Sequence, residues 1–446
     1  MTAFGDAGVA AARVSRAGIP LDDGGLGVAP VEVSGDSSIA FSGSTYLIAW
    51  IGSAVYTRRY ASDGAPIDPA PVLIQTVTNA TGYYRPHRIA VAGNGKAFLV
   101  VWIDSGRPDA QFPTLFGATI TVDGTVSAAR PIIGIGYYDG ELDIAWNGQV
   151  FLVIWGYFTA SVIEGPPNRR ATLAVRVASD GSPIDGAPTF IDTPAINTRS
   201  STVASNGRDF MVALDGYRGL TLVPITTSSG SLTVGSPKTL FPWICCTQSD
   251  ITSDANGYAI SWRYPKPSSI PYDPRILTSQ WYLGVAHLTS GGDHYSGVFT
   301  TINVATRDLS FDLAGPSTAT NRLGDAAVTI REQLPGSVPR VRAYFDWEMT
   351  PMPALPTAPR NVVVNGSRDN FVVSWEPTSN DATGFAVEGL IRGISYSLYV
   401  VAADQRSVSI NYPYDAVRVI ALNAGGMSEP SELVPVQPRR RAMGSR

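Results

Sequence analysis

The stretch RIAVAGNGKAFLVVW, residues 88–102, contains the pattern that decides the fold. A short alternating segment leads into Asn94-Gly95, and a second, more apolar segment follows and ends at Trp102. Asn-Gly supplies the positive φ angles of a two-residue hairpin turn. Alternation of apolar and polar side chains is typical of half-buried strands. The stretch therefore predicts a β-hairpin.

The hairpin pattern recurs along the chain. Further copies are found at Ser38–Trp50, Asp143–Trp155, Ser201–Leu214 and Asp250–Trp262, with a faded sixth copy at Asp308–Ile330. A second pair of strands around an Asp-Gly turn follows at 60–68, 120–126 and 177–185. Four strands per unit, repeated every roughly 50–60 residues, predict the blades of a β-propeller.

The N-terminal segment Ala12–Asp22 (ARVSRAGIPLD) matches only the second half of this unit. We expect these strands to complete the last blade, because that pairing leaves no open sheet edge. The sequence thus predicts an all-β chain whose residues 1–350 form a propeller of about six blades.

The last quarter of the chain has a different composition. Residues 351–359 (PMPALPTAP) predict a stiff linker. Residues 360–437 are similar to a fibronectin type III domain, with Trp375 as its buried tryptophan and Asn423–Ser431 as its last hairpin turn. Asp415 occupies the position of the family's tyrosine, and Tyr414 lies one residue before it. The sequence contains no Arg-Gly-Asp. Residues 438–446 predict a disordered basic tail.

The propeller units also resemble the G-x-x-[FY]-L-V-x-W … R-V-x-x-D-G-x-x-[IL]-D repeats of large secreted or surface proteins from myxobacteria-like bacteria. This resemblance covers roughly residues 10–350 and implies an extracellular or cell-surface location. Met1–Val9 lacks the pattern of a signal peptide, so we expect the signal to have been removed or the export route to need none.

Composition limits the classes of partner. Charged residues make up 16% of the chain and the net charge is −4, which predicts neither nucleic-acid binding nor attraction to anionic lipid. The sequence has no apolar run of the roughly 20 residues that cross a bilayer, so we expect no membrane insertion. Cys245 and Cys246 are adjacent; two free thiols and a strained vicinal disulfide both stay open.

The turns distinguish the two faces of the predicted propeller. Asn-Gly and Asp-Gly connections are short and belong to one face, whereas Asp104–Pro113, Gly156–Arg170 and Arg263–Arg275 are long and belong to the other. Loops on a rigid scaffold often carry binding residues. The candidate ligand-binding residues, which lie where the first strand of each unit begins, are Tyr84, Arg85, His87, Tyr138, Asp139, Glu141, Arg199, Asp250 and Arg307.

Aromatic rings interleaved with arginines and carboxylates suit a glycan or a peptide. The structural alternative is that Asp143, Asp250 and Asp308 bind backbone amides where the chain enters each blade, and that the tyrosines pack between blades. The recurring Trp50, Trp102, Trp155 and Trp262 predict packing between blades rather than a sugar platform.

The sequence contains no catalytic or cofactor motif. We find no zinc spacing among its three histidines, no nucleophile elbow, P-loop or calcium loop, and no sialidase Asp box. We therefore expect no cofactor and no metal. Three hypotheses remain: a non-enzymatic binding or assembly module, a carbohydrate-active enzyme using scattered acids such as Glu141 and Asp250, and a self-assembling structural subunit.

Overall fold

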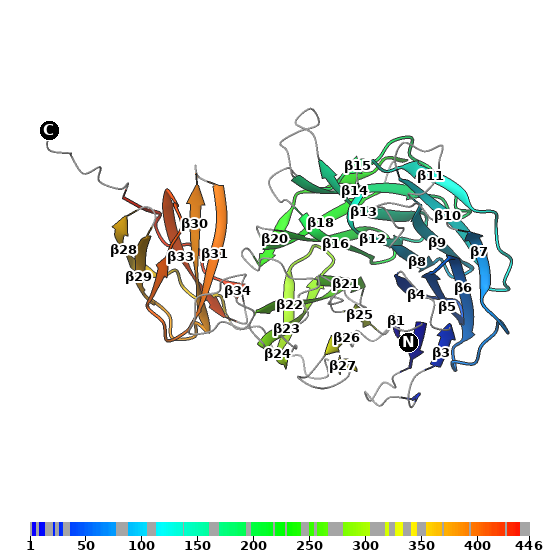
Figure 1. The fold of residues 1–446 in the computed structure, drawn as a ribbon, viewed down its shortest axis with the longest axis horizontal. Coiled ribbons are helices and arrows are strands. Elements are labelled where there is room, and N and C mark those ends of the chain that lie inside the picture. Colours follow the sequence, from blue (N-terminus) through cyan, green and yellow to red (C-terminus); the bar gives the residue numbers. More distant parts are fainter. Residues whose placement is uncertain are drawn as a thin grey trace.

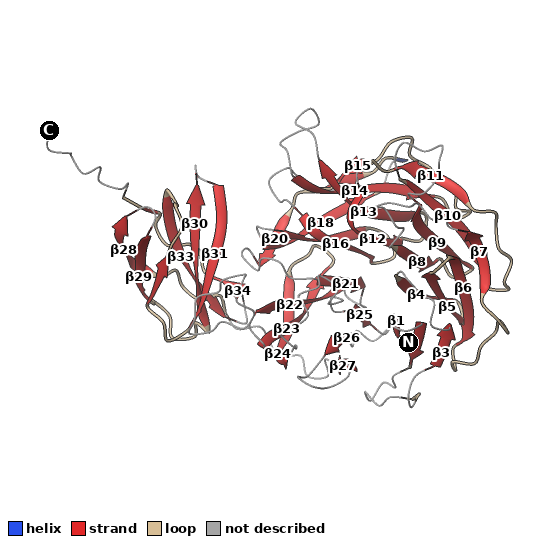
Figure 2. Cartoon of the chain, viewed as in Figure 1, coloured by secondary structure: helices blue, strands red, loops and turns tan. Residues whose placement is uncertain are grey.

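A computed structural model describes much of the chain, and the structural statements below concern only the residues that it describes. These are residues 2–5, 9–13, 21–22, 26–29, 36–76, 88–104, 113–136, 138–159, 169–192, 198–216, 219–227, 230–241, 249–253, 257–265, 280–303, 317–320, 326–332, 340–345, 354–367, 370–391, 394–423 and 426–437. Their regular structure consists of strands in antiparallel sheets (Figure 2), so the all-β prediction is confirmed. Within these residues no helix is long and apolar enough to span a membrane.

The strands up to residue 345 form seven sheets arranged around a common centre (Figure 1). The N-terminal sheet contains β1 (Thr2–Gly5), β2 (Val9–Ala12) and β3 (Leu26–Ala29). The next two contain β4 (Ser37–Ser42), β5 (Thr45–Ile51), β6 (Ala54–Ala61) and β7 (Val72–Thr76), then β8 (Ile89–Gly93), β9 (Ala97–Asp104), β10 (Thr114–Thr121) and β11 (Arg130–Gly134).

The remaining four sheets continue around the ring. They contain β12 (Tyr138–Trp146), β13 (Phe151–Thr159), β14 (Arg169–Val177) and β15 (Thr189–Phe190); β16 (Thr198–Ser205), β17 (Phe210–Gly216), β18 (Gly219–Thr226), β19 (Thr233–Val234) and β20 (Lys238–Phe241); β21 (Ser249–Ser253), β22 (Gly257–Pro265), β23 (Gln280–Thr289) and β24 (His294–Asn303); and β25 (Ser317–Thr320), β26 (Ala326–Glu332) and β27 (Arg340–Phe345).

This arrangement is a β-propeller. The first strand of each repeat lies beside the first strand of the next, in the order β4, β8, β12, β16, β21 and β25. We call these six the inner strands, because they lie nearest the centre of the ring (Figure 1). The predicted propeller is thereby confirmed.

The predicted count of about six blades is not confirmed, because seven sheets surround the centre. In the described residues, β1–β3 form their own sheet and do not pair with β25–β27. Both sheets already contain a pair of neighbouring strands corresponding to the second and third strands of a blade, so they cannot be halves of one blade. The short β1–β2 hairpin carries neither Asn-Gly nor tryptophan, and the repeat pattern therefore did not reveal it.

Hydrophobic cores lie between neighbouring blades. These cores combine strands of adjacent sheets, as where Val91 and Val100 pack with Leu47 and Ala49. Trp50, Trp102, Trp155 and Trp262 are at most 3% exposed. These tryptophans therefore serve interblade packing, as predicted, and cannot form an external platform for sugars.

An arginine–aspartate pair closes the second half of three sheets. Arg59 donates from Nη2 to Asp68 at 2.6 Å, and its Nη1 donates to the backbone oxygen of Val122 on the next sheet at 2.8 Å. Equivalent pairs join Arg13 to Asp22 and Arg176 to Asp185. Each pair fastens its own outer loop, and the Arg59 and Arg176 pairs also bind the following blade.

The residues after 354 form a β-sandwich of two sheets. One contains β28 (Arg360–Ser367), β29 (Asn370–Glu376) and β32 (Ser407–Ile410); the other contains β30 (Gly384–Ile391), β31 (Ile394–Ala402), β33 (Ala416–Asn423), β34 (Gly426–Met427) and β35 (Val434–Pro435). Phe371, Trp375, Phe385 and Val419 meet in a core built from both sheets. Tyr414 is 1% exposed in that core, so the displaced tyrosine is buried despite its shifted position.

Candidate functional site

The inner strands are tied together by side chains that bind backbone amides. The Asp143 carboxylate accepts the N–H of Ile144 at 2.8 Å and, on the next inner strand, the N–H of Val203 at 2.8 Å. Ser38 Oγ accepts the N–H of Val91 at 3.2 Å in the same way. The structure therefore shows the structural alternative for Asp143, in which its carboxylate binds backbone amides.

Three charged residues stand at the same level where consecutive inner strands begin. Asp36, Arg88 and Glu141 each precede the residue that pairs with the recurring tryptophan: Ser37 with Trp50, Ile89 with Trp102, and Leu142 with Trp155. Register thus places the guanidinium on the strand between the two carboxyl groups. We call Asp36, Arg88 and Glu141 the mouth cluster.

The mouth cluster combines a partly exposed ion pair with a neighbouring acid. Arg88 Nη1 lies 3.6 Å from Asp36 Oδ2, and the two side chains are 41% and 32% exposed. Asp36 also accepts the N–H of Ser37 at 2.9 Å. At this exposure the ion pair alone contributes little to stability.

Burial perturbs the acids at this end of the ring. It raises the pKa of the Glu141 carboxyl to about 7, against the opposing effects of the Arg88 charge and the Ser201 amide. Burial likewise raises the pKa of Asp143 to about 6, and that of Asp36 against the charge of Arg88. Glu141 is thus partly protonated at neutral pH.

The structure covers the predicted site residues unevenly. Tyr84, Arg85, His87 and Arg307 lie outside the described residues, as do Cys245 and Cys246. Tyr138, Asp139 and Arg199 have described backbones only, at the starts of β12 and β16. Asp250 on β21 occupies the position equivalent to Asp143.

Glu141 is the one predicted site residue that the structure places in the mouth cluster. Sequence reasoning missed Asp36 and Arg88 as its neighbours. Aligning the residue before the tryptophan partner in each repeat could have found both, because that position is charged in three consecutive units.

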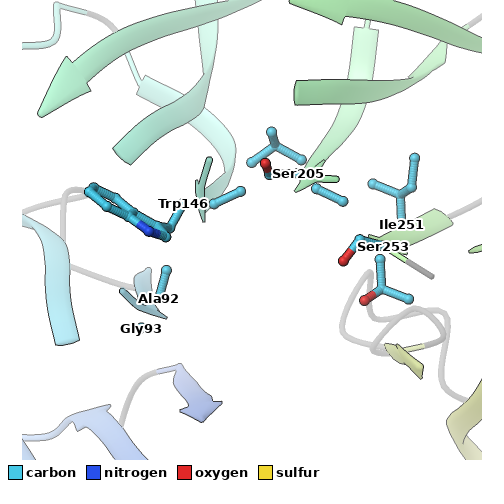
Figure 3. Close-up of a pocket in the computed structure, with 10 residues that line it drawn as sticks. Ala92, Gly93, Trp146, Ser205, Ile251 and Ser253 are labelled. Atoms are coloured by element: carbon cyan, nitrogen blue, oxygen red, sulfur yellow. The ribbon is translucent and has the colours of Figure 1, made fainter. Parts of the chain in front are cut away.

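A hollow of about 310 Å³ lies at the opposite ends of the inner strands. It is lined by Ala92, Gly93, Ala145, Trp146, Val203, Ala204, Ser205, Ile251, Thr252 and Ser253. Figure 3 shows the labelled side chains around the hollow, with Trp146, Ala92 and Gly93 across from Ile251 and Ser253. The short turns predicted little room at this face. The small side chains that precede the turns leave the hollow open.

The two ends of the ring therefore differ in chemistry. The end where the inner strands begin carries the mouth cluster, and the other end carries a hollow whose described lining residues are uncharged. Among the described residues, no group of three or more His, Cys, Asp or Glu side chains could hold a metal ion.

The fold and these two ends define the chain as a β-propeller joined to a β-sandwich. Neither a known protein family nor a curated protein matches it. Solved structures that resemble it include a sialidase from Trypanosoma rangeli, at 8% identity over 98% of this chain and 92% of that one, with a TM-score of 0.43.

Two further structures resemble this chain. The β-propeller domain of the Trilobed protease from Pyrococcus furiosus is 12% identical over 76% of this chain and 88% of that one, with a TM-score of 0.36. A protein of unknown function from Dyadobacter fermentans is 12% identical over 70% and 94%, with a TM-score of 0.43. Likenesses at this level say nothing of activity.

Proposed function

We propose that the chain is a non-enzymatic binding or assembly module of an extracellular or surface structure. In this proposal, the end of the propeller that carries the mouth cluster binds a glycan or a protein partner. The sandwich, whose two-sheet core around Trp375 supports a fibronectin type III-like domain, acts as a spacer or docking unit.

One observation carries the proposal: the described acids at this end are already engaged in holding the inner strands. Asp143 accepts two backbone amides, and Asp36 accepts an amide and faces Arg88. The Ser201 amide likewise favours the carboxylate form of Glu141. General acid–base catalysis needs carboxyl groups that can exchange protons with the substrate. These acids instead suit a fixed rim at this end of the propeller.

The experiment is a glycan-array screen of the full chain beside Arg88→Gln. We expect specific binding that weakens at least tenfold in the variant, because the guanidinium supplies charge-assisted hydrogen bonds. Arg208→Gln is the matched control, since Arg208 is an arginine with an 89% exposed side chain on the short-turn face. Equal loss in both variants would contradict a site at the mouth cluster. Silence across the glycan array would shift the proposal to a protein partner.

A carbohydrate-active enzyme is the second candidate, favoured by the perturbed pKa of Glu141. A carboxyl group with a pKa of about 7 is protonated enough at neutral pH to act as a general acid, with Asp36 as the second carboxyl. Release of reducing ends from a polysaccharide, lost in Glu141→Gln, would establish this alternative and overturn the binding module.

Self-assembly as a structural subunit is the remaining hypothesis. Val363 and Val372, on β28 and β29, are 46% and 37% exposed. A sedimentation series tests it: association that rises with concentration and disappears in Val363→Ser/Val372→Ser would support it.

A further inference from the structure

We propose that the N-terminal blade binds one extended strand of a partner protein, which lies beside β1 as the inner strand of this blade. The inference goes beyond the proposed function, because it concerns the pairing edge of β1 and not the mouth cluster. It would stand even if the mouth cluster bound no ligand.

Equivalent positions identify the strands of the N-terminal sheet. Arg13 and Asp22 are separated by nine residues, as are Arg59 and Asp68. β3 follows Asp22 at the same interval as β7 follows Asp68. β2 and β3 are therefore the third and fourth strands of this blade, and β1 is its second strand. Among the described residues, no first strand pairs with β1.

The row of inner strands is open at this blade. Each inner strand from β4 to β25 lies beside the next one, whereas the two ends of the row, β25 and β4, do not lie beside each other in this way. β1 lies beside β4 as β5 lies beside β8, and Figure 1 places β1 in the part of the ring between β25 and β4. The edge of β1 therefore borders a position for one more inner strand. Unpaired strand edges readily add a strand from another chain.

The side chain that this strand should cover is more exposed than its equivalents. Ile39 on β4 faces the N-terminal blade and is only partly buried. Phe41, on the same face of β4, is 47% exposed. The residues equivalent to Ile39 on the other inner strands are between 4% and 7% exposed; they are Val91, Ile144, Val203 and Ile251. Each of these has a preceding inner strand beside it, and Ile39 does not.

The cores between the other blades show what the bound strand must contribute. Four of these cores contain an alanine that the preceding inner strand places directly after its Ile or Val. These alanines are Ala40, Ala92, Ala145 and Ala204. The core around Ile39 contains Val9, Ala11 and Val28 from β2 and β3, and none of its described residues comes from an inner strand of the N-terminal blade. An alanine of the bound strand fits this position.

The residue before the Ile or Val should be polar. The Asp143 carboxylate accepts the N–H of Val203 on the next inner strand, and Ser38 Oγ accepts that of Val91. The equivalent N–H on β4 belongs to Ile39. The bound strand therefore carries Ser, Thr or Asp, then Ile or Val, then Ala. This pattern, together with pairing along β1, selects an extended polypeptide segment.

A partner protein is the source of this strand. The sequence contains the pattern three times, at residues 38–40, 143–145 and 202–204, and all three segments already form inner strands of their own blades. The same holds for a second copy of the chain. The chain after β27 leads to the sandwich, where Asn423 Nδ2 donates to the backbone oxygen of Ala354 at 2.8 Å. The sandwich lies outside the ring, beside β20 (Figure 1).

The probe is a synthetic peptide with the sequence of residues 141–147, ELDIAWN, which contains Asp-Ile-Ala. It carries a fluorophore, and its anisotropy is followed as the full-length chain is added. We expect saturable binding that is at least tenfold weaker when the peptide contains Ala145→Gln, because the longer side chain overfills the core and buries an amide. Ile39→Asn in the chain should also weaken binding at least tenfold. Leu73→Asn is the matched control, since Leu73 is 53% exposed on β7 of the same sheet, and it should bind like the wild type.

Hydrogen exchange locates the bound peptide without any variant. The amides of Thr2–Gly5 should exchange at least tenfold more slowly in the complex, whereas those of Val72–Thr76 should not change. Arg88→Gln should leave peptide binding intact, which separates this inference from the proposed function.

Several results would overturn the inference. Two are the absence of saturable binding at millimolar peptide and equal binding of the two peptides. Another is slow exchange of Thr2–Gly5 in the free chain that the peptide does not alter, because another segment of this chain then pairs with β1. Self-association of the chain that the peptide reverses would assign the position to a second copy and overturn the partner protein as its source.

Discussion

Removing the carboxylate of Asp68 should destabilise the propeller at least as much as removing the whole ion pair. The Asp68 and Arg59 side chains are 9% and 12% exposed, so the pair is nearly buried. Arg59 Nε donates to the carboxylate at 3.1 Å, and the Arg59 backbone N–H donates to the same group at 2.7 Å. Asp68→Ala therefore leaves a guanidinium charge and an amide without their acceptor.

The magnitude follows from these contacts. Breaking a buried pair by removing one partner costs about 3–5 kcal/mol, and the slight exposure places Asp68→Ala near 3 kcal/mol. Arg59→Met should cost a similar amount, because it leaves a buried carboxylate and also removes the bond to Val122. The double variant leaves no charge and loses hydrogen bonds worth about 1 kcal/mol each, so we expect a total of about 2–3 kcal/mol.

Differential scanning calorimetry of the full chain is the assay, with the transition of the sandwich as internal reference because its core is separate. The reasoning predicts strong non-additivity: the double variant should be no less stable than either single variant. Additive costs of the two substitutions would refute this reasoning. So would single variants whose stability lies within 0.5 kcal/mol of the wild type, which is the typical range for surface changes.

Two further predictions concern close packing in the two domains, and a third concerns the buried acids of the propeller. Gly124→Ala should destabilise the propeller, because its Cβ would lie 2.5 Å from Arg59 Nη2 at a φ of +104°; the same calorimetry reports it, and an unchanged transition would contradict the close approach. Gly389→Ala should lower only the sandwich transition, since its Cβ would meet the Tyr414 ring at 2.6 Å. Between pH 8 and pH 5 the propeller should become more stable as the pH falls: burial raises the pKa of Asp143 and Asp192 to about 6 and that of Glu141 to about 7, so the folded state binds protons that the unfolded state does not. A propeller transition that falls steadily over that range would contradict these shifts.

The repeat could be predicted from sequence because it depends on local chemistry. Asn-Gly turns and alternating strands around Trp102 and Trp155 fix a hairpin wherever they occur. The arginine–aspartate pairs depend on an offset of nine residues between Arg59 and Asp68, which the repeat of the Asp-Gly segment already contains. These features bring a blade together without distant partners.

The number of blades and the residues of the site could not be predicted from the sequence, because both depend on contacts between segments far apart in the chain. The short β1–β2 hairpin lacks turn and tryptophan signals, so only its pairing reveals a separate sheet. Ala92 and Ala145 are unremarkable as residues in a strand. Only the packing of neighbouring inner strands brings both to the hollow.

The mouth cluster illustrates the same limit. Its charges are separated by about 50 residues in the chain, and only the register of β4, β8 and β12 places Asp36, Arg88 and Glu141 side by side. The sequence placed Glu141 where an inner strand begins, but gave no measure of the burial that raises its pKa.

The most direct test of the central claim is the state of a glycan after it has been bound. The full chain is incubated overnight at neutral pH with a glycan that it retains on the array, and the eluted glycan is analysed by mass spectrometry. A binding module returns the glycan at its original mass. Shortened or unsaturated products that Glu141→Gln does not form would contradict the account and make the propeller an enzyme.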